Sequence, residues 1–345
     1  MKPAASGFSP LDRQLAVWDK HWSEQVAKQA VWLSGLVTFE EAERILGQVG
    51  GLVMSDSSVW RRVAVWGERF RGVEATQRAL ADGGGRTAEA ATVLGKMGVA
   101  LDGATVHVRG EGWKELKVGC VFDVVLQPTW DRQSEEWVDT AHAVRASYVA
   151  HLGGPERFGQ VLRTAAQRRG WTQARDTIAL GDGAGWIWHL VSDQFYDSRQ
   201  AVDWYHASQH LWQVAHGLHA AGSPAAQAWY RAHETLLFQG HADRIAARLR
   251  QAAHTHPQHA EMLRREAGYF GDNRRRMQYQ SLHEDGWPIG SGVVESACKQ
   301  FRHRFAGSGM RWSRPGIERL LPIRAAVLGH AFDAMWSAAY SSPPN

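Results

Sequence analysis

Cysteine and long apolar stretches are nearly absent from this 345-residue sequence. The two cysteines, Cys120 and Cys298, stand far apart and outside any CxxC pair, which argues against a disulfide framework and a cysteine-based zinc site. No run of about 18 uncharged apolar residues is present to span a membrane. The first residues, MKPAASGFSPLDRQ, lack the apolar segment of a secretory signal. We therefore expect a cytoplasmic protein with no membrane association.

Motifs that mark several common enzyme classes are also missing. The sequence contains neither the GxxxxGK[ST] loop of P-loop nucleotide hydrolases nor the GxSxG turn that carries a nucleophilic serine. Its 17 histidines include helical spacings such as His216 and His219, but no cysteine or flanking carboxylate completes a closed zinc site. Nucleotide hydrolysis, serine catalysis and structural zinc are thus disfavoured.

The composition is that of a folded, mildly basic protein. Hydrophobic residues make up 44% of the chain and charged residues 21%, and the net charge is +4. A chain of this length is expected to divide into two or three domains. Because the net charge is small, the placement of basic residues says more about partners than their number does.

Residues 1–81 are expected to form a small all-α domain. Thr38, with a glutamate three residues later, has the pattern of a helix N-terminus, and Gly50-Gly51 ends that helix before a second one begins. A helix, a glycine-containing turn and a helix are the outline of a helix-turn-helix, with Arg61 and Arg62 near the start of the second helix. We predict a helix-turn-helix-like DNA-binding region, with an ordinary helical hairpin as the alternative.

The pattern changes from helical to β-type after a glycine-rich segment, residues 82–94, that is typical of a linker. Hairpin-connected strands followed by helical crossovers predict a mixed sheet flanked by helices. This order matches the ribonuclease H fold, so residues 95–206 are expected to form the first part of a ribonuclease H-like core. Strands are expected at 99–108, 113–126, 141–152, 177–180 and 201–205, and helices at 155–169 and 186–194.

The rest of the chain shows helical patterning only. Residues 207–285 are rich in Ala, His, Leu, Arg and Gln at helical spacing, which predicts a helical insertion. Residues 286–345 are expected to complete the core, with one helix at 293–305 and a last helix at 315–336. The expected fold class is an α/β ribonuclease H-like mixed sheet with a helical insertion, preceded by a small all-α helix-turn-helix-like domain.

Two aspartates occur where a strand core would otherwise be apolar. Asp102 interrupts VALDG, and Asp182 ends the apolar run in ALGDGAGW. A buried charge is costly unless it is paired or binds a metal, and neighbouring glycines allow a ligand to approach closely. Carboxylates at the ends of adjacent strands suit hard divalent ions. The alternative is that each Asp-Gly pair is an ordinary turn.

Glu295 adds a third carboxylate in a strongly basic setting. It lies in GSGVVESACKQFRHRF, and residues 296–326 hold seven Lys or Arg against Glu318 alone. Such a cluster favours phosphate contacts around a metal-binding carboxylate. The alternatives are an acidic residue that favours the helix N-terminus and a solvated basic face. The residues expected to contact DNA here are Lys299, Arg302, Arg304, Arg311 and Arg314.

The helical insertion carries a second basic segment. Residues 244–276 hold eight Arg against three acidic residues, and the densest run is Arg274, Arg275 and Arg276. Aromatic residues are interleaved with these arginines, which is typical of a surface that follows a nucleic-acid backbone. A helix surface rich in Arg for solubility is the alternative.

Four segments together resemble bacterial insertion-sequence transposases of the ISKra type, which are distantly Mutator-like. They are VALDGATV around Asp102, ALGDGAGWIW around Asp182, DWYHASQHL from Asp203, and PIGSGVVESACKQFRHRFAGSGMRWS around Glu295. The resemblance implies a DDE triad of Asp102, Asp182 and Glu295 on a ribonuclease H-like core. It also implies that Asp203 and His206 form the Asp-x-x-His motif that follows the second aspartate, with a role in local architecture or DNA handling.

That resemblance implies a DNA transposase that cleaves and joins the ends of an insertion sequence. Two Mg²⁺ or Mn²⁺ ions held by the triad would activate the attacking oxygen and stabilise the leaving one. The implied partners are double-stranded DNA and further copies of the chain, as a homodimer or higher oligomer at the bacterial nucleoid. Two alternatives stay open: another ribonuclease H-fold nuclease or resolvase, and an inactive transposase-derived DNA-binding protein.

Overall fold

The computed structural model describes residues 22–82, 95–131, 135–290, 292–307 and 309–341. These residues form two compact units. The sheet unit lies within Thr76–Met310, and the terminal unit combines the described residues of Met1–Ala75 and Arg311–Asn345. The segment 286–345, expected to complete the core, is therefore divided between the units after Met310. Apart from residue 82, the expected linker at 82–94 lies outside the described residues.

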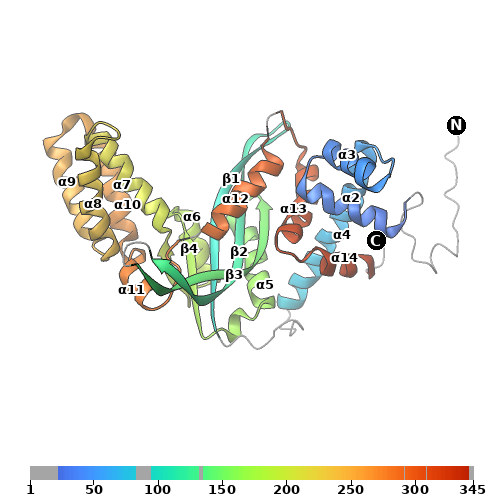
Figure 1. The fold of residues 1–345 in the computed structure, drawn as a ribbon, viewed down its shortest axis with the longest axis horizontal. Helices are drawn as coiled ribbons and strands as arrows, with labels where there is room; N and C mark the ends of the chain where they lie inside the picture. The colour runs from blue at the N-terminus through green and yellow to red at the C-terminus, as the bar shows by residue number, and fades with distance from the viewer. Residues whose placement is uncertain (1–21, 83–94, 132–134, 291, 308, 342–345) are drawn as a thin grey trace. The chain divides into compact units, whose positions relative to one another are not determined.

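A mixed five-stranded sheet forms the centre of the sheet unit (Figure 1). The order across the sheet is β3-β2-β1-β4-β5, with β1, β2 and β3 antiparallel and β4 and β5 parallel to β1. This confirms the expected α/β class with a mixed sheet. The strands are β1 (Lys96–Val108), β2 (Gly112–Asp131), β3 (Glu136–Leu152), β4 (Asp176–Gly181) and β5 (Arg199–Val202).

The two faces of the sheet have different neighbours. Val99 and Leu101 of β1 share one apolar cluster with residues of α5 (Pro155–Arg168) and α6 (Gly185–Gln194). Because side chains alternate along a strand, Asp102 points to the opposite face. There α12 (Gly292–Phe305) packs along β1 and β2. The charged residue that the sequence singled out thus lies under α12 and away from the main apolar cluster.

The fifth strand is shorter than the sequence predicted. β5 ends at Val202 and α7 (Trp204–Leu218) begins two residues later, so the expectation of a strand to residue 205 was wrong. The cause is Asp203, whose side chain accepts a hydrogen bond from the backbone N–H of His206 and caps the new helix. Strand pairing therefore stops one residue before the aspartate.

β2 and β3 continue past β1 as a two-stranded hairpin. β1 pairs with β2 only up to Val124, whereas β2 and β3 remain paired to their ends. Trp130 and Trp137 face each other across this hairpin with ring centroids 5.7 Å apart. The sequence predicted shorter strands because Pro128 and the charged residues that follow weaken the β pattern.

The segment expected to be a helical insertion is helical. Apolar side chains along it, such as Leu211, Ile245 and Phe270, join the same cluster as the sheet residues. In Figure 1 these helices are yellow to orange. After α7 come α8 (Pro224–Phe238), α9 (Ala242–Thr255), α10 (Ala260–Asn273) and α11 (Tyr279–Glu284).

No helix within the described ranges is long and apolar enough to cross a membrane.

Helices alone make up the terminal unit, as far as it is described. Thr38 and Glu41 cap the start of α3 reciprocally, and Gly51 ends that helix with φ of 62°. The single last helix expected at 315–336 was wrong, because the chain turns at His330, where φ is 54°. The helices are α2 (Glu24–Leu36), α3 (Phe39–Gly50), α4 (Asp56–Asp82, in this unit up to Ala75), α13 (Arg314–Leu328) and α14 (Phe332–Ser341).

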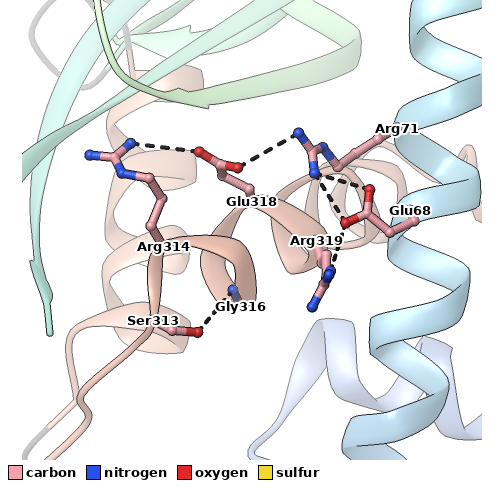
Figure 2. Close-up of polar contacts among 7 residues, drawn as sticks. All are labelled: Glu68, Arg71, Ser313, Arg314, Gly316, Glu318 and Arg319. Carbon is pink, nitrogen blue, oxygen red and sulfur yellow. Dashed lines mark hydrogen bonds and ion pairs between the residues drawn. The ribbon is translucent and has the colours of Figure 1, made fainter.

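Alternating charges join α4 and α13 within the terminal unit (Figure 2). Glu68 of α4 lies 2.7 Å from Arg319 and 3.0 Å from Arg71. Arg71 also lies 3.6 Å from Glu318, which in turn lies 3.6 Å from Arg314. All five side chains keep part of their surface exposed, so each pair contributes about 1 kcal/mol or less. Their main effect is to orient Arg314 and Arg319 toward protein carboxylates.

Candidate active site

Three aspartates stand at the same level of three neighbouring strands. The last paired residues of β4 and β5 lie level with Leu101 of β1. Asp102, Asp182 and Asp203 each follow directly, so the register of the parallel strands brings them to one region. The backbone N–H of Asp203 donates to the carbonyl of Gly181 over 2.8 Å and extends this alignment to the third aspartate.

Asp102 is held in an environment that disfavours its charge. Burial raises the pKa of its carboxyl group, and the negative charge of Asp182 adds to this. Hydrogen bonds from the thiol of Cys298 and the backbone N–H of Gly103, together with the charge of His206, partly offset the increase. A partly buried carboxylate beside another carboxylate gains from a cation, so the position suits a metal ligand better than an ordinary turn residue.

Asp182 combines a turn with a carboxylate near the other acidic groups. Its side-chain Oδ1 accepts a hydrogen bond of 2.8 Å from the backbone N–H of Ala184, as a turn-forming aspartate would. Gly183 follows with φ of 102°, a value that favours glycine. The hydrogen bond from Ala184 uses one of the two oxygens of the carboxylate. The turn and the functional interpretation of Asp182 are therefore compatible.

Asp203 and His206 form a fixed pair at the start of α7. Asp203 is fully buried, and its Oδ1 lies 2.9 Å from the backbone nitrogen and 3.2 Å from Nδ1 of His206. This hydrogen bond raises the pKa of His206, and the charges of Asp203, Asp182 and Glu295 act in the same direction, against the effect of burial. The imidazole therefore lies among carboxylates that favour a positive charge at this position.

Glu295 reaches this group from the first turn of α12. Its Oε1 lies 3.8 Å from Nδ1 of His206, and its Oε2 lies 3.7 Å from Nζ of Lys299. Oε1 is buried and has no hydrogen-bond partner among the described residues. A buried carboxylate oxygen in this state is costly unless a cation or donor serves it.

Ligand atoms suited to a cation converge at one point of the sheet unit. One atom each from Asp203, His206 and Glu295 lies within 4.8 Å of the others. Carboxylate oxygens bind Mg²⁺ or Mn²⁺, and an imidazole nitrogen shifts the preference from Mg²⁺ toward a transition metal such as Mn²⁺. The donor set thus fits a divalent cation.

The structure relates the predicted triad and the Asp-x-x-His pair more closely than the sequence suggested. The negative charge of Asp182 raises the pKa of Asp102, the charge of His206 lowers it, and the charge of Asp182 raises the pKa of His206. Glu295 also acts on His206. All five predicted residues are therefore near enough to influence one another's charge. The ligand atoms that lie close enough to hold one metal ion, among the described residues, come from Glu295, Asp203 and His206 and not from the two other aspartates.

The basic residues predicted on α12 have different surroundings. Lys299 and Arg302 are exposed on this helix, and Lys299 lies beside Glu295. Arg304 is 2% exposed, and its side chain is directed into the protein. Arg304 lies on the inner face of the helix, together with the buried residues Val294, Ala297, Cys298, Phe301 and Phe305. Lys299 and Arg302 are therefore the α12 cations that a polyanion can reach.

The remaining predicted DNA contacts are distributed over both units. In the sheet unit Arg274 and Arg275 are exposed, whereas Arg276 donates to Gln200 and stacks over a tryptophan ring. In the terminal unit Arg61 and Arg311 are exposed, Arg62 is partly buried, and Arg314 lies 3.6 Å from Glu318. The exposed arginines remain predictions as DNA contacts.

Two residues beside the site were not predicted from the sequence. Cys298 lies one helical turn after Glu295 and donates a hydrogen bond to Asp102. Burial raises the pKa of the Cys298 thiol, as does the charge of Asp102, so the thiol stays protonated. Tyr269 of α10 donates from its hydroxyl to the carbonyl of Asp182 over 3.1 Å. Helical spacing from Glu295 was a signal for Cys298, but no sequence pattern connects Tyr269 with Asp182.

No protein-family model matches this chain, and no curated protein matches it. The functional interpretation therefore depends on the residues and their geometry.

Proposed function

We propose that this protein is a DDE-type DNA transposase that cleaves and joins DNA with divalent cations at the site formed by Asp102, Asp182 and Glu295. The observation that carries this proposal is the gathering of carboxylates from β1, the end of β4 and the start of α12 around His206. These groups are distant along the chain, and their burial and shared charge are costly without a cation. Phosphoryl transfer is the chemistry that uses such a site beside exposed cations.

The strand order supports a ribonuclease H-like core. An antiparallel β1-β2-β3 meander followed by parallel β4 and β5 is the order that the sequence pattern predicted for this fold. The three carboxylates of the proposed site are also the residues that the resemblance to ISKra-type transposases implies as the catalytic triad. We propose that α3 and α4, with Arg61 exposed, form the helix-turn-helix-like segment, and that double-stranded DNA is the ligand of both units.

The protein's own residues have distinct proposed roles. Asp102, Asp182 and Glu295 would hold Mg²⁺ or Mn²⁺, with Asp203 and His206 close enough to contribute to the same site. When bound, two such ions activate the attacking oxygen and stabilise the leaving oxygen. Cys298 keeps the Asp102 carboxylate oriented through its hydrogen bond. Lys299 and Arg302 would contact the DNA backbone next to Glu295. Two DNA ends must be held together, so a homodimer or higher oligomer is proposed.

The deciding experiment is a cleavage and joining assay with the full chain. A plasmid carrying the DNA that flanks the coding region is incubated with protein and Mn²⁺ or Mg²⁺, and products are mapped by sequencing. The wild type is expected to cut at specific ends and to join the freed 3′ ends to target DNA. Asp102→Asn should bind the same DNA in a mobility-shift assay and leave it uncut. Asp193→Asn, which alters an exposed aspartate on α6, is the matched control.

Each outcome of this assay has a defined meaning. Specific cuts without joined products would favour a ribonuclease H-fold nuclease or resolvase. DNA binding by the wild type without cleavage under either metal would favour an inactive DNA-binding protein. Cleavage that survives in Asp102→Asn would overturn the assignment of the site.

A further inference from the structure

Tyr269 of α10 lies against the turn that carries Asp182. Its hydroxyl donates to the Asp182 carbonyl oxygen over 3.1 Å. A β-carbon placed on Gly183 would lie 2.7 Å from Cε2 of the Tyr269 ring, so ring and turn are in close contact. The edge of the Tyr269 ring thus packs directly against the backbone of the Asp182 turn. A side chain at position 183 would not fit between them.

The ring of Tyr269 is itself supported from within the helical segment. The imidazole of His210 on α7 stacks on it, with ring centroids 3.6 Å apart and planes at 20°. Nδ1 of His210 lies 2.6 Å from Oε2 of Glu266, a carboxylate that is 1% exposed and also paired with Arg265 at 2.9 Å. Contacts between α7 and α10 therefore hold the Tyr269 ring in place.

The Tyr269 hydroxyl stays a neutral donor throughout the usual pH range. Burial raises the pKa of this phenol, and the charges of Asp182, Asp203 and Glu266 act in the same direction. A neutral phenol that donates to a backbone carbonyl constrains the backbone without adding charge to the carboxylate site. This is the property required of a group that supports a ligand-bearing turn.

We infer that Tyr269 is a positioning residue that holds the Asp182-Gly183 turn in the conformation needed for cation binding. The inference rests on the proposed function of Asp182 as a metal ligand. It gives the helical segment a second role besides its exposed arginines. The segment supports the active site through α10 and α7, in the way that outer contacts orient ligands at other metal sites.

The test uses the full chain with Tyr269→Phe, which keeps the ring and removes only the hydroxyl. Tyr230→Phe is the matched control, because its hydroxyl contacts Ser208 and Glu234 and no residue of the site. Mn²⁺ alone is titrated into each protein by calorimetry, and amide hydrogen exchange is followed over residues 181–187. For Tyr269→Phe we expect Mn²⁺ affinity to fall by about five- to tenfold, the loss that one neutral hydrogen bond supports. Exchange should quicken in that peptide alone.

A second variant and a folding control make the result decisive. His210→Gln removes the stacked ring beneath Tyr269 and should change Mn²⁺ affinity and exchange in the same direction, to a smaller extent. Thermal unfolding of Tyr269→Phe should stay within about 4 °C of the wild type, as expected for the loss of at most about one hydrogen bond. Unchanged affinity and unchanged exchange in Tyr269→Phe would overturn the inference, as would equal changes in Tyr230→Phe.

The DNA assay separates this inference from the proposed function. If the wild type cuts DNA, Tyr269→Phe should need about five- to tenfold more Mn²⁺ for half-maximal cleavage, with DNA affinity unchanged. If the wild type binds Mn²⁺ but never cuts DNA, the proposed function fails. The affinity and exchange measurements then still decide the role of Tyr269.

Discussion

The acidic residues of the site are placed in two different ways. Asp102, Asp182 and Asp203 belong to neighbouring strands or follow them directly, so backbone pairing aligns them. Glu295 arrives on α12 from a later part of the chain, and packing of that helix against β1 and β2 sets its position. The strand-borne carboxylates are therefore fixed by hydrogen-bonded register, whereas the helix-borne one depends on side-chain packing, which a single substitution alters more easily.

The largest expected effect concerns the strand-borne group. Asp102→Asn should reduce DNA cleavage by at least about a thousandfold, because residues that act as one catalytic unit lose most of its rate when one is removed. DNA affinity should stay unchanged. Initial rates at saturating Mn²⁺ and a mobility-shift titration measure both quantities, with Asp193→Asn as the control. Residual activity above one tenth of wild type would show that the strand-borne group is not essential.

The link between the two groups is His206, and its removal should weaken cation binding. His206→Gln is expected to lower Mn²⁺ affinity by about 10- to 100-fold, since residues at or next to metal ligands have effects of this size. The Asp203 cap to the backbone N–H of residue 206 remains, so the fold should persist. Calorimetric titration with Mn²⁺ measures the effect. An unchanged dissociation constant for Mn²⁺ would show that His206 does not link Glu295 to the aspartates of the strands.

On α12 itself, the outward and inward cations should behave differently. Arg302→Ala is expected to weaken DNA binding several-fold and to reduce the salt dependence by about one unit of slope, as for the loss of one phosphate contact. Arg304→Ala should instead lower thermal stability, because this side chain is buried. Binding at several salt concentrations, with a melting curve for each variant, distinguishes them. The interpretation of α12 fails if Arg302→Ala leaves the salt slope unchanged.

Stability without metal should change in opposite directions at two of the aspartates. Asp203→Ala should cost about 1–2 kcal/mol, because a helix cap is lost. Burial raises the pKa of Asp102 in the folded state, so its ionised form destabilises the metal-free protein once pH exceeds that pKa. Asp102→Asn should therefore unfold at higher denaturant than wild type at about pH 8, and the two should match below the ordinary Asp pKa of about 3.9. If Asp102→Asn were still more stable than the wild type at about pH 3.5, the predicted pH dependence would be wrong.

The parts of the fold that local pattern controls were predicted well. The apolar run that begins at Val99 identified β1, and the Thr38 capping pattern identified the start of α3. The predicted end of β5 was wrong because the sequence around Asp203 fits two structures. One is the continuation of an apolar strand, and the other is the start of a helix that Asp203 caps. Local residues do not decide between them, whereas the cap hydrogen bond to His206 does.

The positions of Asp102 and Asp182 in or just after apolar runs, and of Glu295 after a glycine-rich entry, follow from the amino-acid order alone, because burial of apolar side chains specifies strands and helices locally. The tertiary structure decided which of these groups meet. It placed Glu295 beside His206, turned Arg304 inward, and brought Tyr269 of α10 against the Asp182 turn. Such contacts join residues far apart in the chain, and they depend on how helices pack on a sheet, which no local pattern encodes.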